Sequence, residues 1–233
     1  MSSRIVEFRG AMRRVGVVSA ISIAVLLTGC AVGKPRVDMY NGLLPDGVTP
    51  AATTLAPRTG QFRNQTVYIV LGANYLSYSD TWAGFQKIAD EGGFANLAYT
   101  REELQAFQRF WSPERTTSLV VDTLKKHFSD VRVADDLAQA KELGARWIVV
   151  YDHSYRQPTT ATATWTNHTV IDLLSADRLQ LIARAEVNET QSRGIAMGSS
   201  DVHRLTRQRG EDLVGCITRA AQQFDRKLSA LDG

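Results

Sequence analysis

The sequence predicts an α/β fold: a single mixed-sheet domain that follows a signal peptide and a flexible tether. Short apolar runs alternate with segments of helical period between residues 65 and 157. Two long alternating runs then favour an antiparallel hairpin over 160–190. Finally, residues 201–231 repeat apolar side chains at spacings of three and four, which is typical of a helix packed on a sheet.

The chain begins with a basic stretch and a short apolar run, which is the layout of an export signal. Four arginines precede thirteen apolar or small residues that run from Val15 to Leu27. Thirteen helical residues rise only about 20 Å, whereas the hydrocarbon core of a membrane is roughly 30 Å thick. We therefore expect residues 1–29 to be a signal peptide rather than a membrane-spanning anchor.

The residues that end this run, Leu27-Thr28-Gly29-Cys30, resemble the bacterial lipobox, in which small residues precede a cysteine. In lipobox proteins the cysteine receives a diacylglycerol, the signal is cut before it, and the new amine is acylated. The resemblance implies that Cys30 begins the mature chain and carries acyl chains, palmitate among them. Several chains anchor durably because each buried methylene contributes about 0.8 kcal/mol. Ala31 implies the outer membrane, with the domain facing the periplasm. The alternative is an ordinary buried cysteine.

Removing the signal changes the charge balance. Four of the 27 basic residues and one of the 24 acidic residues lie within residues 1–29, which leaves 23 of each. A neutral chain lacks the dense basic surface that nucleic acid requires, so we expect no nucleic-acid partner. A lipidated Cys30 also leaves Cys216 without a disulfide partner, and we expect that thiol to be buried.

Residues 30–64 carry four prolines with scattered glycine and threonine and almost no apolar periodicity. We interpret them as a lipidated Cys30 and a flexible tether. Such a tether would reach several nanometres from the membrane at roughly 3 Å per residue. The periplasmic α/β domain is then expected to span residues 65–233.

The domain should open with a buried strand, because Thr66 to Tyr75 is a continuous run rich in β-branched residues. Its remaining elements before the hairpin are expected as a helix from Pro113 to Phe128, a strand at 131–134, a helix at 136–144 that stops at a glycine, and a strand at 145–157.

An aromatic-rich insertion, at about residues 75–112, separates the first strand from these elements. It holds nine of the nineteen aromatic residues of the chain. The rings either form core under the sheet or present a surface for a partner. We expect Phe85 and Phe107 in the core. Tyr78 and Trp82 have polar neighbours, so we expect them to be partly exposed and, with Trp111, to bind a partner.

The hairpin is expected to turn at residues 175–178, and the closing helix to bury Cys216 and Phe224. This order resembles a group of envelope domains that includes the amino-terminal domain of the Tol-system propeller protein, the curli secretion lipoprotein and the outer-membrane lipoprotein of the Pel exopolysaccharide system. Residues 140–155 and 170–187 carry the likeness, which spans about 115–231. It implies a non-catalytic, often oligomeric assembly module and assigns no functional residue.

No enzyme signature stands out: the chain has no G-x-S-x-G, no G-x-G-x-x-G, no P-loop, no H-E-x-x-H and no zinc-type cysteine pair. His153 and His168 would lie across from each other in a hairpin centred near residues 160 and 161. A metal site needs further ligands on the same face, so we expect no metal and no cofactor.

Two functions follow from the sequence. We expect a non-catalytic assembly or adaptor component of an envelope export or envelope-building system, which contacts the membrane through Cys30 and binds envelope proteins or a second copy of itself. The alternative is a lipoprotein that binds a small ligand or glycan in a groove lined by the aromatic insertion.

Overall fold

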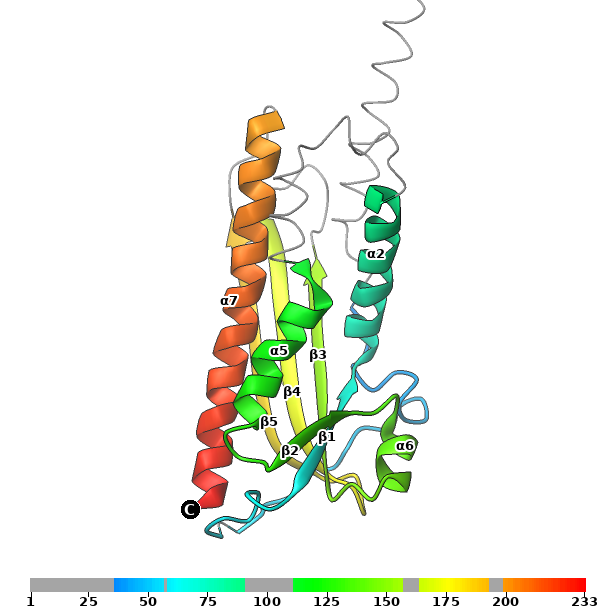
Figure 1. Cartoon of the computed structure of the whole chain (residues 1–233), viewed down its shortest axis with the longest axis vertical. Coiled ribbons are helices and arrows are strands. Elements are labelled where there is room, and N and C mark those ends of the chain that lie inside the picture. The colour runs from blue at the N-terminus through cyan, green and yellow to red at the C-terminus, as the bar shows by residue number, and fades with distance from the viewer. Residues whose placement is uncertain (1–35, 57, 91–110, 157–163, 193–198) are drawn as a thin grey trace, which may run out of the picture.

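The computed structural model describes residues 36–56, 58–90, 111–156, 164–192 and 199–233 (Figure 1). The expected signal peptide and Cys30 lie outside these ranges. Within them the elements are β1 (Thr66–Leu71), α2 (Ala73–Asp90), α5 (Pro113–Leu124), β2 (Asp130–Val133), α6 (Leu137–Glu142), β3 (Trp147–Arg156), β4 (Thr164–Ser175), β5 (Leu181–Ser192) and α7 (Ser199–Asp232). The α/β fold class with one mixed sheet is confirmed.

The sheet is open, with the strand order β2-β1-β3-β4-β5. β1 is parallel to both β2 and β3, whereas β3, β4 and β5 form an antiparallel meander. This follows from the connections: helices link the parallel strands, and shorter connections link the antiparallel ones. Of the described helices, none has the length and apolar character needed to cross a membrane.

The first strand is shorter than predicted. β1 ends at Leu71, and α2 begins two residues later. Gly72 makes the transition, because its N–H still donates to Tyr151 on β3 while its carbonyl accepts the N–H of Leu76, the first helical bond. The expected strand residues after Leu71 therefore belong to a helix.

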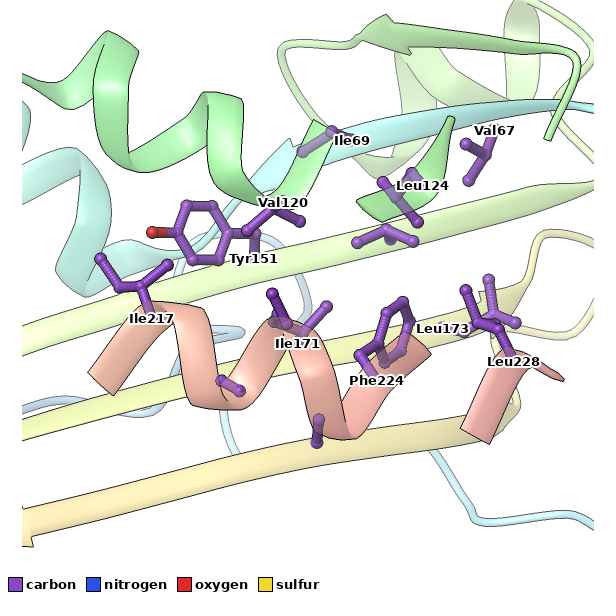
Figure 2. Packing of buried hydrophobic residues seen from close by; sticks show 14 of the residues in the cluster. Val67, Ile69, Val120, Leu124, Tyr151, Ile171, Leu173, Ile217, Phe224 and Leu228 are labelled. Atoms are coloured by element: carbon purple, nitrogen blue, oxygen red, sulfur yellow. The ribbon is translucent and has the colours of Figure 1, made fainter. Parts of the chain in front are cut away.

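Helices α5 and α7 cover one face of the sheet (Figure 1). α5 starts with the Ser112 hydroxyl accepting the N–H of Arg115 and with Pro113 in its first turn, a favourable helix start. α7 inserts Ile217, Phe224 and Leu228 between the helices and the sheet, where Figure 2 shows them beside Ile171 and Leu173 of β4. This face holds the main core, and Cys216 is buried in it as expected.

The opposite face of the sheet is covered by α6 and by the N-terminal part of the described chain. Met39 and Tyr40 are buried there with Leu137 of α6 and Val150 of β3. Phe62 is also buried, on the α7 side, against Phe128 and Trp147. The tether prediction is therefore wrong for Met39, Tyr40 and Phe62, because these residues pack on the domain rather than extend away from it.

Candidate functional site

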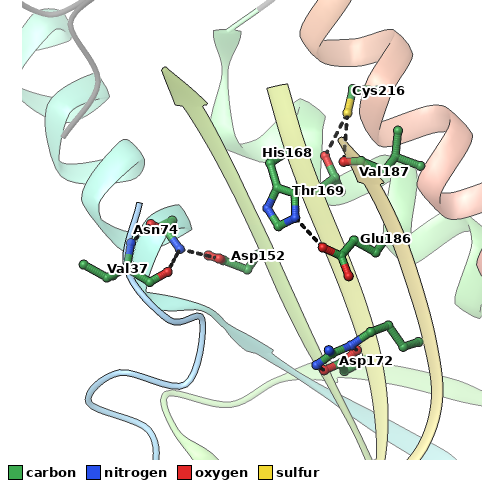
Figure 3. A network of polar contacts seen from close by, with 10 residues as sticks. Val37, Asn74, Asp152, His168, Thr169, Asp172, Glu186, Val187 and Cys216 are labelled. Carbon is green, nitrogen blue, oxygen red and sulfur yellow. Dashed lines mark hydrogen bonds and ion pairs between the residues drawn. The ribbon is translucent and has the colours of Figure 1, made fainter. Parts of the chain in front are cut away.

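Residues 36–44, which we call the N-terminal strap, are fastened to the start of α2. The N–H of Val37 donates to Oδ1 of Asn74 (3.0 Å), and Nδ2 of Asn74 donates to the carbonyl of Val37 (2.9 Å), as Figure 3 shows. The N–H of Ala73 donates to the carbonyl of Met39 (3.1 Å). One side-chain amide thus satisfies both backbone groups of a strap residue and fixes the strap in register.

Asp152 of β3 extends this arrangement into the sheet. Its side chain accepts hydrogen bonds from Nδ2 of Asn74 (2.6 Å) and from the N–H of Tyr75 (2.8 Å). Burial raises the pKa of Asp152 above its usual value, while these two donors act to lower it. The carboxyl also fits closely under the chain, since a Cβ on Gly72 would lie 2.6 Å from the Cβ of Asp152.

A second carboxylate, Asp172, holds the middle of the strap through Tyr40. The hydroxyl of Tyr40 donates to Oδ2 of Asp172 (2.5 Å), and Asp172 also accepts two bonds from the guanidinium of Arg184 (2.8 and 2.7 Å). Asp172 is fully buried. The bond to Asp172 raises the pKa of Arg184, and burial raises that of Tyr40. The strap therefore supplies one of the partners that this buried charge requires.

His168 and Glu186 form a third pair on this face. His168 Nε2 lies 2.8 Å from Glu186 Oε1, and this contact lowers the pKa of Glu186. The register explains why these groups lie together: Asp152 of β3 pairs with Val170 of β4, which pairs with Glu186 of β5, and Asp172 of β4 pairs with Arg184 of β5. Side chains directly opposite one another point to the same face, so three strands present their polar groups together under the strap.

The same register separates the two histidines considered as metal ligands. His168 lies opposite Ser154, whereas His153 lies opposite Thr169. Neighbouring positions along a strand point to opposite faces, so His153 and His168 are on different sides of the sheet. In the part of the chain that the structure describes, no three His, Cys, Asp or Glu side chains gather to hold a metal ion.

The acids beneath the strap are already engaged in hydrogen bonds within the fold. Each of these three acids, Asp152, Asp172 and Glu186, accepts hydrogen bonds from neighbouring side chains. Sequence reasoning missed the site because the strap meets the sheet across long sequence separations, 132 residues between Tyr40 and Asp172. The available signal was local: polar residues interrupt otherwise apolar strands at 152 and 172.

Two of the three residues expected to bind a partner, Trp82 and Trp111, are buried. Trp82 is only 5% exposed, and Trp111 is 8% exposed. Tyr78 donates its hydroxyl to the carbonyl of Trp111. The predicted exposure of Trp82 is therefore wrong: Trp82 and Trp111 belong to the main core, whereas Tyr78 is partly exposed, as predicted, and packs against that core. The side chain of Phe85, and Phe107 altogether, lie outside what the structure describes.

Tyrosine rings surround a buried histidine, His153. His153 packs edge-on against Tyr75 and Tyr78, with ring centroids 5.1 and 4.6 Å away, and its Nδ1 lies 3.1 Å from the hydroxyl of Tyr151. Its Nε2 has no hydrogen-bond partner among the described residues. Burial lowers the pKa of His153 to about 3, so the ring is neutral in the folded chain.

No protein-family model matches this sequence, and neither does any curated protein. Among solved structures, a PelC dodecamer from Paraburkholderia phytofirmans is 15% identical, over 75% of this chain and 94% of that chain, with a TM-score of 0.36. An uncharacterised lipoprotein B from Nitrosomonas europaea is 12% identical, over 76% and 89%, with a TM-score of 0.33.

Proposed function

We propose that this chain is an outer-membrane lipoprotein anchored through acyl chains on Cys30, with its α/β domain in the periplasm. It acts as a non-catalytic assembly or adaptor component of an envelope export or envelope-building system. The basic start, the short apolar run and the Gly-Cys ending support the anchor. The resemblance of residues 140–155 and 170–187 to an envelope group supports the adaptor role.

The strap limits how far the folded domain can lie from a lipid anchor on Cys30. Arg36 is the first described residue, and the strap is fastened by Val37 and Tyr40. From Cys30 to Arg36 the chain takes six residue steps, which span at most about 20 Å. A lipid on Cys30 would therefore hold the folded domain close to the membrane surface, within reach of membrane-bound partners.

The strap site also supports a non-catalytic role. General acid–base chemistry needs a titratable group that can reach a substrate. The carboxylates of the strap site instead bond to Asn74, Tyr40, Arg184 and His168 within the fold. The alternative of a glycan groove lined by the aromatic insertion loses support, because Trp82 and Trp111 are buried.

Metabolic labelling with a fatty acid tests the anchor. We expect Cys30→Ala to abolish the label and leave an uncleaved precursor, because the thiol is the proposed site of attachment. Cys216→Ala is the matched control: it removes the only other cysteine, a buried residue of α7, and should keep the label. Label retained by Cys30→Ala would refute the anchor.

Crosslinking in intact cells tests the adaptor role. The wild-type chain should crosslink to a defined set of envelope proteins or to a second copy of itself, and Cys30→Ala should lose those products because the domain leaves the membrane. A chain that crosslinks to no protein in the envelope would contradict the adaptor role while leaving the anchor intact.

A further inference from the structure

A pocket of about 740 Å³ opens at the end of the sheet where β3 begins and β4 turns into β5. It is remote in sequence from the strap, and the strap does not line it. Its walls come from residues 53–55, from the end of α6 and the start of β3, and from the β4–β5 turn. Three chain segments that are distant in sequence thus converge on one hollow.

The backbone holds each wall in place. Gly144, with φ of +79°, turns the chain from α6 toward β3. Just before β3, the carbonyl of Arg146 accepts the N–H of Ala176 (3.0 Å). The β4–β5 turn is closed by the N–H of Ser175 donating to the carbonyl of Gln180 (3.0 Å). Its Leu179 adopts φ of 51°, a left-handed conformation that non-glycine residues rarely take.

Residues 53–55 form the third wall, and they are also fixed. The N–H of Thr53 donates to the carbonyl of Leu181 (2.9 Å), and the N–H of Leu181 donates to the carbonyl of Ala51 (2.9 Å). This short bridge adds an extra strand-like segment beside the start of β5. It brings the hydroxyl-bearing Thr53 and Thr54 to the pocket.

The charges that line the pocket are unbalanced. The pocket is lined by three cationic side chains, Lys141, Arg146 and Arg178, and by one carboxylate, Asp177. Asp177 and Arg178 are both exposed and 3.8 Å apart, a separation and exposure at which an ion pair contributes little. No carboxylate of the described residues lies within ion-pair distance of Lys141 or Arg146. The pocket therefore keeps an excess of positive charge.

One of these cations is also held by a ring. The guanidinium carbon of Arg146 lies 5.5 Å from the centroid of the buried Trp147 ring, and both residues line the pocket. A cation–aromatic contact of this kind restrains the side chain without using its hydrogen-bond donors. Arg146 thus remains available to bind an anion, and its position is set in advance.

We propose that this pocket binds a phosphate group, presented either by a lipid headgroup or by a free phosphate ester. Two guanidinium groups suit phosphate because each can donate two parallel hydrogen bonds to its oxygens. Lys141 adds a third charge, and the hydroxyls of Thr53 and Thr54 add neutral donors. The inference is independent of lipidation, since none of these groups belongs to the anchor.

The melting temperature of the full chain in a zwitterionic detergent tests this proposal. Inorganic phosphate is titrated against chloride at equal ionic strength, and phosphatidylglycerol is compared with phosphatidylcholine in the micelles. A ligand that binds only the folded chain raises the melting temperature. We expect a rise with phosphate, with phosphatidylglycerol, or with both, and the probe that acts identifies the source of the phosphate group.

Substitutions at the pocket test whether the rise in melting temperature comes from binding there. We expect no rise in melting temperature for the triple variant Lys141→Gln/Arg146→Gln/Arg178→Gln. The control is Lys125→Gln, which removes an exposed cation at the end of α5, outside the pocket, and should keep the rise. Should the triple variant unfold, Arg178→Gln alone should at least halve the rise, because its side chain is exposed. No rise with either probe, or an equal rise in the pocket variants, would overturn the proposal.

Discussion

Asp152 and Asp172 are the residues on which the strap depends. A buried carboxylate is costly unless it is hydrogen-bonded or paired, and each of these acids takes one of its bonds from the strap or from the residue that fastens it. We infer that the two acids specify where the strap lies more than they add to stability. An apolar strand face could bury the strap equally well, but it would not fix which strap residue faces which strand.

Gly72 shows how closely this site is packed. Gly72→Ala should lower the free energy of unfolding by about 2 kcal/mol or more, because the new Cβ would meet the Cβ of Asp152 at 2.6 Å and neither group can move freely. Denaturant titration measures the loss.

Gly215→Ala is the matched control for Gly72→Ala. It lies within α7, where a Cβ would meet only the flexible end of Arg219 at 3.3 Å, so alanine should add up to about 1 kcal/mol. Equal losses in the two variants would show that Gly72 is not specially confined.

His153 should make the fold sensitive to acid. Its pKa is about 3 in the folded chain and about 6.5 when unfolded, so between these values the unfolded chain binds more protons. Stability should therefore fall as the pH drops from 6.5, by up to about 4 kcal/mol near pH 3. The measurement is the free energy of unfolding at several pH values.

His153→Gln should flatten this acid-side slope, because glutamine does not titrate. Asp152 works in the opposite direction: its raised pKa gives a contribution that is present below the unfolded value and lost as the pH rises through the folded one. Because Asp152 is present in both the wild type and His153→Gln, its effect cancels when their slopes of unfolding free energy against pH are compared. Parallel slopes would contradict a buried neutral His153.

Trp82 illustrates where sequence reasoning failed at the residue scale. Its hydroxyl and carboxylate neighbours suggested exposure, but adjacent residues on a helix point in different directions. Tyr75, Tyr78 and Trp82 recur at spacings of three and four and so share one face of α2, which packs toward β3. This spacing was the better guide to burial, because the polar neighbours belong to the other sides of the helix.

The elements with strong periodicity were predictable. The hairpin of β4 and β5 and the closing helix α7 follow from alternation and from three-and-four spacing, and both are confirmed. The strap and the segment around Phe62 have no such pattern. Their order comes from single side chains that meet partners far along the chain, such as Gln61 and Phe62 with residues 231 and 232. Local sequence carries little information about contacts of this kind.

Phe224 tests the packing of α7. It is fully buried between α7 and the sheet, so Phe224→Ala should lower the free energy of unfolding by about 3 to 5 kcal/mol through lost burial and the remaining cavity. Gln222→Ala, an exposed position on the same helix, should change it by less than about 0.5 kcal/mol. A loss below about 1 kcal/mol for Phe224→Ala in denaturant titration would mean that α7 is not packed as described.

On the scale of the whole molecule, the strap changes the proposed relation between the domain and the membrane. A tether from Cys30 to residue 64 would allow a reach of about 120 Å, because each extended residue spans at most about 3.5 Å. With the strap fastened at Val37 and Tyr40, the reach falls to about 20 Å. The proposed lipoprotein is therefore a membrane-apposed adaptor rather than one that extends far into the periplasm.

Neutron reflectometry of the lipidated chain on a supported bilayer tests this central claim most directly, because it measures the thickness of the water layer between the headgroups and the protein. We predict a water layer of at most about 20 Å, the span of the six residue steps between Cys30 and Arg36. A water layer of about 40 Å or more would exceed that span. Such a gap would contradict the account by showing that the strap is released from the sheet when the chain is anchored.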